Sequence, residues 1–430
     1  MDASSYLAPR QVALDILMAC LDRGQPLDDV LGQHTGFPKL DPRDRAFVRM
    51  LLATTVRRLG EIDGVLGTLI DRPIGDDATV ALQSLRLGAA QLLFLATPPH
   101  AAVDTAVRLV EQAKLPHLKG LVNAVLRRIA REGVALLGDR DAATLNAPAW
   151  LWQSWVDAYG EETARAIAAA HLVEAPLDIT PRGNAESWAQ QLEAEILPTG
   201  TLRRAAGGYI ADLPGFAEGA WWVQDAAATI PVRLMGDIAG KRIADLCAAP
   251  GGKTMQLCAG LAAVTAVDVS ARRMVRLGEN LTRSGLSAEL VTSDVSKWKT
   301  SDKFDVVLLD APCSGTGTLR RHPDIAWLKS DEDVARLTLT QDRLLLRALE
   351  LLEPGGMLIY AVCSLQADEG PERIESLLAR RPLLKRIPVQ PEELPGLVEA
   401  ITLAGDVRTL PSMWPERGGL DGFYVARLST

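Results

Sequence analysis

From Arg242 onward the sequence alternates short apolar runs with segments of helical periodicity, and this alternation limits the possible folds more than any other feature. Strands separated by helices form parallel βαβ units. Right-handed crossovers bring the carboxyl ends of such strands to one edge of the sheet, where open α/β sheets bind ligands. The predicted strands are Ile243–Cys247, Val264–Val269, Glu289–Thr292, Phe304–Asp310 and Met357–Cys363. We therefore expect a doubly wound sheet with its functional residues at those strand ends.

The first third of the chain has a purely helical pattern. From Pro9 to about Arg131 the apolar residues recur at the spacing of helix faces, which predicts five or six helices. One of them should begin at Pro42 with Asp41 as its cap, because Asp favours the cap and Pro the first turn.

The residues between these two regions are mixed. Strands are expected at Leu177–Thr180 and Tyr209–Leu213, with a helix near Ala185–Ala194. We therefore predict an α/β protein of three domains, which are an all-helical domain over 1–140, a small α/β domain over 141–238 and a parallel-sheet domain over 239–430.

Composition bounds the class of protein. With 48% hydrophobic and 23% charged residues, the chain resembles a globular protein rather than a disordered one. The longest uncharged stretch, 87–103, contains Pro98 and Pro99 and is too short to span a membrane, so it predicts a buried helix. The five cysteines show no close metal-type pairing, which predicts neither disulfides nor zinc. We expect a cytoplasmic monomer with no membrane or metal partner.

The net charge of −8 disfavours non-specific coating of nucleic acid. A local basic surface remains open, and the pairs Arg57-Arg58, Arg127-Arg128 and Arg320-Arg321 are candidates for it. Each pair can either contact phosphates or simply face solvent.

A strand-turn-helix with two glycines follows the first predicted strand. It reads Asp245-Leu-Cys-Ala-Ala-Pro-Gly-Gly-Lys253, and it lacks both the G-x-G-x-x-G spacing of a dinucleotide site and the full P-loop pattern. Glycines at such a turn let the backbone approach a ligand closely. The residues that would line the ligand are Cys247, Ala248, Ala249, Pro250, Gly251, Gly252 and Lys253.

Two carboxylates end the next two strands. Asp268 is placed to accept the hydroxyls of a ribose, and Asp294 is placed to accept an exocyclic amine of adenine. Each has a simpler explanation, because Asp often caps the helix that follows a strand. Together with the glycine turn they favour a cofactor that contains adenosine.

Two cysteines follow the fourth and fifth strands, at Ala311-Pro-Cys313-Ser-Gly315 and Val362-Cys363-Ser364. A thiolate that adds to C6 of a pyrimidine makes C5 nucleophilic, and a base must then remove the C5 proton. Cys313 and Cys363 can share these tasks, with Lys253 favouring the thiolate and Asp310 binding the N3/N4 edge of cytosine. The residues alone leave open which thiol attacks.

These motifs closely resemble the NOL1/NOP2/Sun family of RNA cytosine-5 methyltransferases. The resemblance covers about 240–430 and includes Asp310-Ala-Pro-Cys-Ser-Gly-Thr-Gly317, Arg320-Arg-His-Pro-Asp324 and Gly419-Leu-Asp-Gly-Phe-Tyr424. It implies that Cys363 is the nucleophile and that Cys313 assists release. It also implies that residues 247–253, Asp268, Asp294 and Asp310 bind S-adenosylmethionine. This sequence departs from the family at Val362, where relatives usually carry Thr or Ser.

The N-terminal third is similar to NusB, an all-helical RNA-binding fold, through Pro9-Arg-Gln-Val-Ala-Leu-Asp-Ile-Leu, Asp41-Pro-Arg-Asp-Arg-Ala-Phe-Val and Leu121-Val-Asn-Ala-Val-Leu-Arg127. NusB-like helices joined to a Sun-type domain imply a bacterial 16S rRNA methyltransferase. The resemblance also implies that 141–238 is RNA-recognition-like and that Gln224–Ala228 borders the active cleft. The same chemistry on tRNA, or a non-catalytic RNA-binding assembly factor, remain as alternatives.

Overall fold

The structure is a computed structural model that describes residues 6–75 and 78–430. The chain divides into two compact units. The first takes in the described residues up to Leu172 together with Arg321–Lys329, and the second consists of Val173–Arg320 and Ser330–Thr430. The three-domain division at 140 and 238 stays a prediction.

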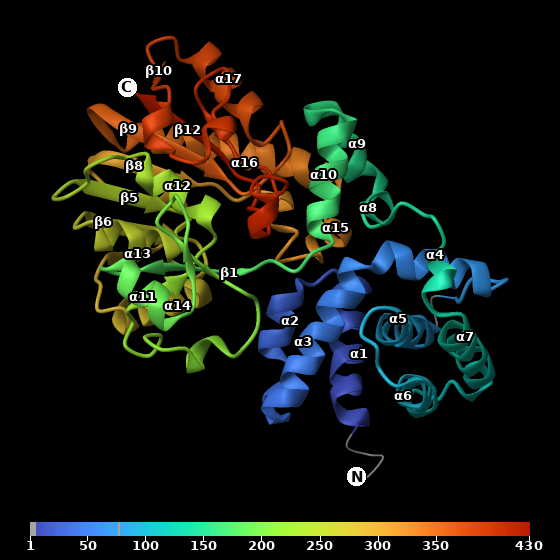
Figure 1. Ribbon diagram of the computed structural model, residues 1–430. Helices are drawn as coiled ribbons and strands as arrows, with labels where there is room; N and C mark the ends of the chain where they lie inside the picture. The colour runs from blue at the N-terminus through green and yellow to red at the C-terminus, as the bar shows by residue number, and fades with distance from the viewer. Residues whose placement is uncertain (1–5, 76–77) are drawn as a thin grey trace. The chain divides into compact units, whose positions relative to one another are not determined.

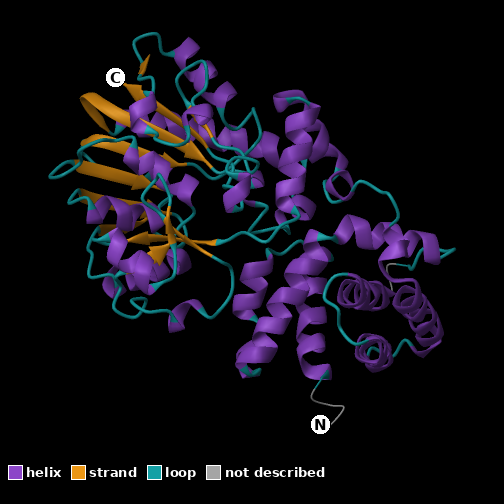
Figure 2. Cartoon of the chain, viewed as in Figure 1, coloured by secondary structure: helices purple, strands orange, loops and turns teal. Residues whose placement is uncertain are grey.

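The described part of the first unit contains helices and no strand (Figure 2). Its α-helices are α1 Leu7–Leu21, α2 Leu27–Gln33, α3 Pro42–Arg57, α4 Leu59–Leu69, α5 Thr79–Leu93, α6 Pro99–Gln112, α7 Lys119–Glu132, α8 Ala142–Leu145, α9 Ala149–Tyr159, α10 Glu161–His171 and α15 Ile325–Leu328. Seven of them lie in the described residues before 140, so the expectation of five or six was wrong. The reason is local: α3 and α4 are separated by Arg58 alone, which a periodic pattern does not resolve.

Helix α3 begins as predicted. The Asp41 side chain accepts a hydrogen bond from the Asp44 backbone N–H at 2.8 Å, and Pro42 occupies the first turn. The apolar residues of α1, α3 and α5 then form a common buried core. Trp327 of α15 packs against this core and donates its indole N–H to the Val56 carbonyl at 3.0 Å.

The second unit is built on a mostly parallel sheet (Figure 1). Its strands are β5 Arg242–Leu246, β6 Ala263–Asp268, β7 Glu289–Thr292, β8 Phe304–Asp310, β9 Leu352–Val362, β10 Lys385–Arg386, β11 Val407–Arg408 and β12 Tyr424–Ser429. The strand order is β10-β12-β9-β8-β5-β6-β7, with β11 paired to β12. Strands β5 to β9 are parallel and β12 is antiparallel to β9, so the expected α/β class is confirmed.

Alternating side chains of each strand point to opposite faces of this sheet. In β8, Val306 and Leu308 join one buried cluster while Val307 and Leu309 join another. The first cluster includes residues of α12 Ala226–Arg233, α13 Gly252–Ala259 and α14 Ala271–Arg283, and the second includes residues of α16 Asp331–Glu350 and α17 Pro371–Arg380. The sheet is therefore the middle of three layers, and its loops carry the chemistry.

A second, antiparallel sheet has the order β2-β3-β1-β4 and carries helix α11. The bounds are β1 Leu177–Pro181, α11 Ala185–Gln191, β2 Glu195–Ile196, β3 Leu202–Arg204 and β4 Trp221–Val223. The strand expected at Tyr209–Leu213 was wrong, because Ile210–Asp212 forms a 3₁₀ turn closed by Asp212 N–H to Tyr209 O at 2.9 Å. Ile210 and Leu213 are the half-buried residues there, and a spacing of three suits that turn and not a strand.

Candidate active site

The loop after β5 is held close to the sheet by its own backbone. Cys247 has a φ of +62°, and the Ala248 N–H donates to the Val267 carbonyl at 3.1 Å. Gly251 has a φ of +104°, and a Cβ there would lie 2.8 Å from Leu277 Cγ. A glycine is therefore required at this position, both for its left-handed backbone and for lack of space. Helix α13 begins directly after it, at Gly252.

Asp268, at the end of β6, forms a hydrogen bond with this loop. Its Oδ2 accepts the Ala249 N–H at 3.1 Å and its Oδ1 accepts the Ser270 N–H at 2.9 Å, and the side chain is almost fully buried. Each carboxylate oxygen can accept a further hydrogen bond. The explanation of Asp268 as a helix cap was wrong, because the cap of α14 is Ser270, whose hydroxyl accepts the Arg273 N–H. Asp268 instead holds the two loops, and a ribose contact would be added to these hydrogen bonds.

Asp294, unlike Asp268, is a cap: it stands before the 3₁₀ turn Val295–Lys297. Its Oδ1 accepts the backbone N–H of Ser296 at 2.9 Å and its hydroxyl at 2.7 Å. The Ser296 hydrogen bond lowers the pKa of Asp294. Its side chain remains 39% exposed at the end of β7, so it stays open to a ligand.

Lys253 and Asp310 form an ion pair at the centre of the candidate site. The Lys253 Nζ lies 2.7 Å from Asp310 Oδ2 and 5.1 Å from the centre of the Phe423 ring. Burial opposes the charge of Lys253, but the Asp310 carboxylate outweighs burial, so the pKa of Lys253 is raised and the amine stays protonated. Asp310 keeps 30% of its side chain exposed.

The two predicted cysteines come together at the ends of β8 and β9. The Sγ atoms of Cys313 and Cys363 are 3.5 Å apart. The hydrogen bond to Cys363, followed by burial, raises the pKa of Cys313 well above its ordinary value. The loops that carry the thiols are linked by a hydrogen bond from Gly317 N–H to Cys363 O at 3.0 Å. Two sulfurs can therefore reach the same substrate atom or its neighbour.

The thiols of the other three cysteines are expected to be unreactive. Burial raises the pKa of Cys20 and of Cys258 to about 12, and burial also raises the pKa of Cys247. A buried neutral thiol behaves as a small apolar side chain.

Asp245, at the end of β5, is fully buried behind this site. Its Oδ2 accepts the Thr254 hydroxyl at 2.6 Å, and burial raises its pKa to about 7. Because the folded pKa lies above the ordinary value of 3.8, the folded state binds the extra proton between about pH 4 and pH 7. Its contribution to stability is therefore present at low pH and is lost as the pH rises through that window.

We predict that Asp245→Asn removes the loss of stability that occurs as the pH rises, because an amide does not ionise. The free energy of unfolding of the variant, relative to the native protein, should rise by about 2–4 kcal/mol between pH 4 and pH 8. Urea denaturation at several pH values measures it. Asp302→Asn, at a side chain that is 60% exposed, is the control and should give a nearly constant difference. A constant difference for Asp245→Asn as well would contradict the prediction.

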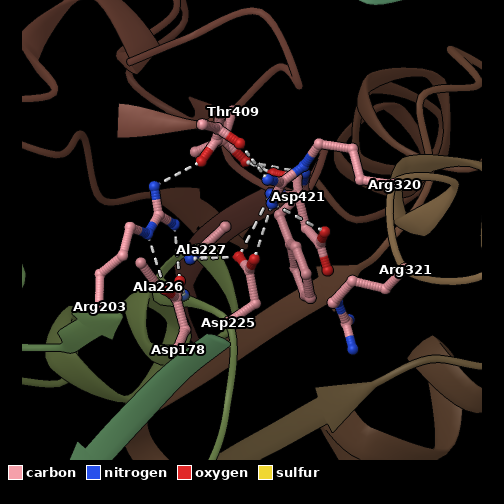
Figure 3. A network of polar contacts seen from close by, with 12 residues as sticks. Asp178, Arg203, Asp225, Ala226, Ala227, Arg320, Arg321, Thr409 and Asp421 are labelled. Carbon is pink, nitrogen blue, oxygen red and sulfur yellow. Dashed lines mark hydrogen bonds and ion pairs between the residues drawn. The ribbon is translucent and has the colours of Figure 1, made fainter. Parts of the chain in front are cut away.

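A network of buried charges lies beside these loops (Figure 3). Arg320 is 1% exposed, and its Nη2 lies 3.0 Å from Asp225 Oδ2 and 3.2 Å from Asp421 Oδ1. Arg203 forms two hydrogen bonds of 2.7 Å with Asp178. The suggestion that Arg320 contacts phosphate or faces solvent was therefore wrong, because its guanidinium is buried against two carboxylates and the Gly418 carbonyl.

Gln224, just before Asp225, lies beside the start of α13. A Cβ added at Gly252 would meet Gln224 Cδ at 3.7 Å, which is ordinary contact. The Gln224 side chain also joins Thr180 of β1 to Gln256 of α13. Gln224, at the expected border of the cleft, is thus in contact with the start of α13.

The sequence did not predict that Asp178, Arg203 and Glu369 belong to the site. Arg203 and Asp178 belong to different strands, and Glu369 lies six residues beyond Cys363 in a loop. A single charged residue in a loop gives no signal of burial, since most such residues are exposed. A carboxylate directly between two functional loops is visible only in three dimensions.

The residues of the site fit S-adenosylmethionine. The first N–H groups of α13 suit the carboxylate of an amino acid, and Asp268, Asp294 and Asp310 suit hydroxyl and amine donors. No cluster of three metal-ligating side chains occurs in residues 6–75 and 78–430. Across those same residues, no helix is long and apolar enough to cross a membrane.

Solved structures share this fold. One described as the crystal structure of PH0851 matches with a TM-score of 0.78 and 21% identity, and it covers 100% of this chain and 99% of that one. The structure of NSun6 from Pyrococcus horikoshii with SFG matches with a TM-score of 0.55 and 18% identity, over 66% of this chain and 98% of that one.

Together with the family match that follows, the sheet and its glycine loop define an S-adenosylmethionine-dependent methyltransferase. Residues 235–429 match the family described as 16S rRNA methyltransferase RsmB/F, and residues 7–131 match the NusB family. The chain belongs to the RsmB/F methyltransferase family.

Two relatives match this chain over almost its whole length. The Ribosomal RNA small subunit methyltransferase B of Klebsiella pneumoniae (strain 342) is 35% identical over 97% of both chains. The protein of the same name from Pseudomonas putida KT2440 is 37% identical over 98% of both chains.

Proposed function

We propose that this protein transfers a methyl group from S-adenosylmethionine to C5 of a cytosine in 16S rRNA, with Cys363 as the nucleophile and Cys313 as the residue that assists release. The observation that carries the proposal is the 3.5 Å separation of the two sulfurs beside the Lys253–Asp310 ion pair. A methyl transfer to nitrogen would need no thiol. Two adjacent thiols suit a reaction at an unreactive pyrimidine carbon.

The covalent step requires the following changes of bonds. Cys363 Sγ, as a thiolate, adds to C6 and the C5–C6 double bond breaks, so that C5 becomes nucleophilic. S-adenosylmethionine, when bound, would supply an electrophilic methyl group to C5; its S–CH3 bond would break and S-adenosylhomocysteine would leave as a neutral thioether. A base then removes the C5 proton, the C5–C6 double bond forms again, and the C6–S bond breaks to return the thiolate.

The surroundings of the two sulfurs suit different roles. The protonated Lys253 amine interacts electrostatically with Cys363, which adds to the causes that raise the pKa of Lys253. A nearby positive charge is a general means by which proteins activate an attacking thiol. Cys313 has a raised pKa and stays neutral until a neighbouring charge or proton acceptor changes. Asp310, held by Lys253 and partly exposed, can accept from the N4 amine of cytosine, or donate to N3 if it carries a proton.

The RNA substrate rests on the family and on the chemistry. Relatives at 35% and 37% identity carry names that specify small subunit ribosomal RNA. A cytosine must leave its stack before a thiol can reach C6, so an accessible loop or an extruded base is the expected target. The NusB-like helices are expected to bind RNA as well.

The test is an incubation of the protein with labelled S-adenosylmethionine and 16S rRNA or total tRNA, followed by mapping of the modified base. We expect 5-methylcytosine in 16S rRNA and none in tRNA. Label in tRNA alone would keep the chemistry and overturn the substrate. Label on neither RNA, with a partly assembled small subunit also tested, would favour the assembly-factor alternative.

A further inference from the structure

Glu369 lies in the loop between β9 and α17 and is completely buried. Its Oε1 accepts the Ser314 backbone N–H at 2.8 Å and the Gln341 side-chain N–H at 3.0 Å. Its Oε2 accepts the hydroxyls of Ser314 and Ser364, both at 2.5 Å. All four donors are neutral. A buried carboxylate of this kind is costly, and four hydrogen bonds are needed to retain it.

The two serines have the same position relative to the thiols. Ser314 directly follows Cys313, and Ser364 directly follows Cys363. The serine hydroxyls are also 3.2 Å from each other. One carboxylate therefore joins both thiol-bearing loops at the residue next to each sulfur. A small shift of this carboxylate would change the distance between the sulfurs.

The backbone also holds these loops, independently of Glu369. Ala311 N–H donates to Ala361 O at 2.9 Å, and Gly317 N–H donates to Cys363 O at 3.0 Å. The loops should therefore fold when the Glu369 side chain changes. What Glu369 adds is the fine position of the sulfurs and a negative charge.

The negative charge of Glu369 acts on the Cys313 thiol. Three titratable groups face Cys313: Cys363 at the end of β9, Tyr360 within β9, and Glu369. The hydrogen bond to Cys363 and burial are the largest causes of the raised pKa of Cys313, and the Glu369 charge adds to them. On the side of Cys363, the charged neighbour is the Lys253 amine.

We propose that Glu369 is a positioning residue, which joins the two thiol-bearing loops, fixes Cys313 against Cys363 and places a negative charge beside Cys313. The division of labour between the thiols rests on the proposed function. The effect of Glu369 on Cys313 does not, since it can be measured without RNA.

The first test measures thiol reactivity. Glu369→Gln replaces the carboxylate with a neutral amide of the same shape. Both proteins also carry Cys363→Ser, so that Cys313 is the thiol studied. The rate at which iodoacetamide alkylates Cys313 is measured by peptide mass at a series of pH values. The pH at which this rate reaches half its maximum should be at least about one unit lower in Glu369→Gln. Glu372→Gln, an exposed glutamate at the start of α17, is the matched control and should leave the midpoint unchanged. An unchanged midpoint in Glu369→Gln would overturn the charge effect.

The second test measures catalysis. Glu369→Gln should lower kcat for methyl transfer about 10–100-fold with KM for RNA within about twofold, because positioning affects the reacting atoms more than binding. Ser364→Ala keeps the Glu369 carboxylate but removes one of its hydrogen bonds. This variant should therefore lower kcat and leave the pH midpoint of Cys313 alkylation unchanged. Wild-type kcat in both variants would overturn the positioning role. If the native protein makes no 5-methylcytosine, the proposed function fails while the alkylation result still decides the effect of Glu369 on Cys313.

Discussion

Cys363→Ala is expected to abolish both methyl transfer and the covalent complex with RNA. The alanine has no sulfur to add to C6, and C5 of an unactivated cytosine is a poor nucleophile, so the loss should be about 10³-fold or more. Single-turnover assays with labelled cofactor measure it. Cys258→Ala is the control, since this buried thiol lies in the same unit with a pKa of about 12, and it should stay within about twofold of the native rate.

Cys313→Ala should give the opposite behaviour on a denaturing gel. Attack and methylation can proceed, but release is slowed by the loss of the second sulfur 3.5 Å away, so the RNA stays bound to Cys363. Turnover should fall about 10²–10⁴-fold while a covalent band accumulates. Normal turnover without a band would show that the thiol roles are assigned wrongly. A band in Cys363→Ala instead would exchange the two roles.

The central strands β5, β6, β8 and β9 could be predicted because most of their residues are buried on both faces of the sheet. Such strands are continuous apolar runs, and their ends are marked by the residues that follow. Phe304–Asp310 was predicted with the same bounds that β8 has. The first strand ends one residue before the prediction, at Leu246, because Cys247 has a left-handed φ that no strand contains.

The fifth strand begins earlier than its pattern suggests. Pro354-Gly355-Gly356 reads as a turn, and the predicted strand therefore started at Met357. In the structure β9 begins at Leu352, which pairs with Phe304, and the register shifts between Phe304 and Val306. The irregularity accommodates the proline and glycines inside the strand.

The candidate site could be predicted as a set of strand ends but not as a set of contacts. That Asp268 and Asp294 follow strands is visible in the sequence. That both side chains already accept hydrogen bonds from backbone N–H groups depends on the loops around them. The position of Glu369 depends on two loops that are about 50 residues apart in the chain, and no local pattern encodes such a meeting.

Arg320→Met should cause the largest loss of stability in the second unit. The substitution keeps much of the apolar volume of the side chain but leaves Asp225 and Asp421 buried without the guanidinium between them. Asp225 still accepts the Ala227 N–H at 2.9 Å and the Asp421 N–H at 3.2 Å, which compensates only in part. Breaking a buried ion pair from one side costs about 3–5 kcal/mol.

Thermal denaturation followed by circular dichroism should therefore show a transition lowered by roughly 10 °C. Arg336→Met is the control: this side chain is 75% exposed and pairs with Asp333 on the surface of α16, so its effect should be under about 1 kcal/mol. Adding Asp225→Asn and Asp421→Asn to Arg320→Met should recover part of the loss, because the uncompensated charges are then removed. If the triple variant is less stable than Arg320→Met, the penalty comes from lost packing and hydrogen bonds, such as that from Arg320 to the Gly418 carbonyl, and not from buried charge.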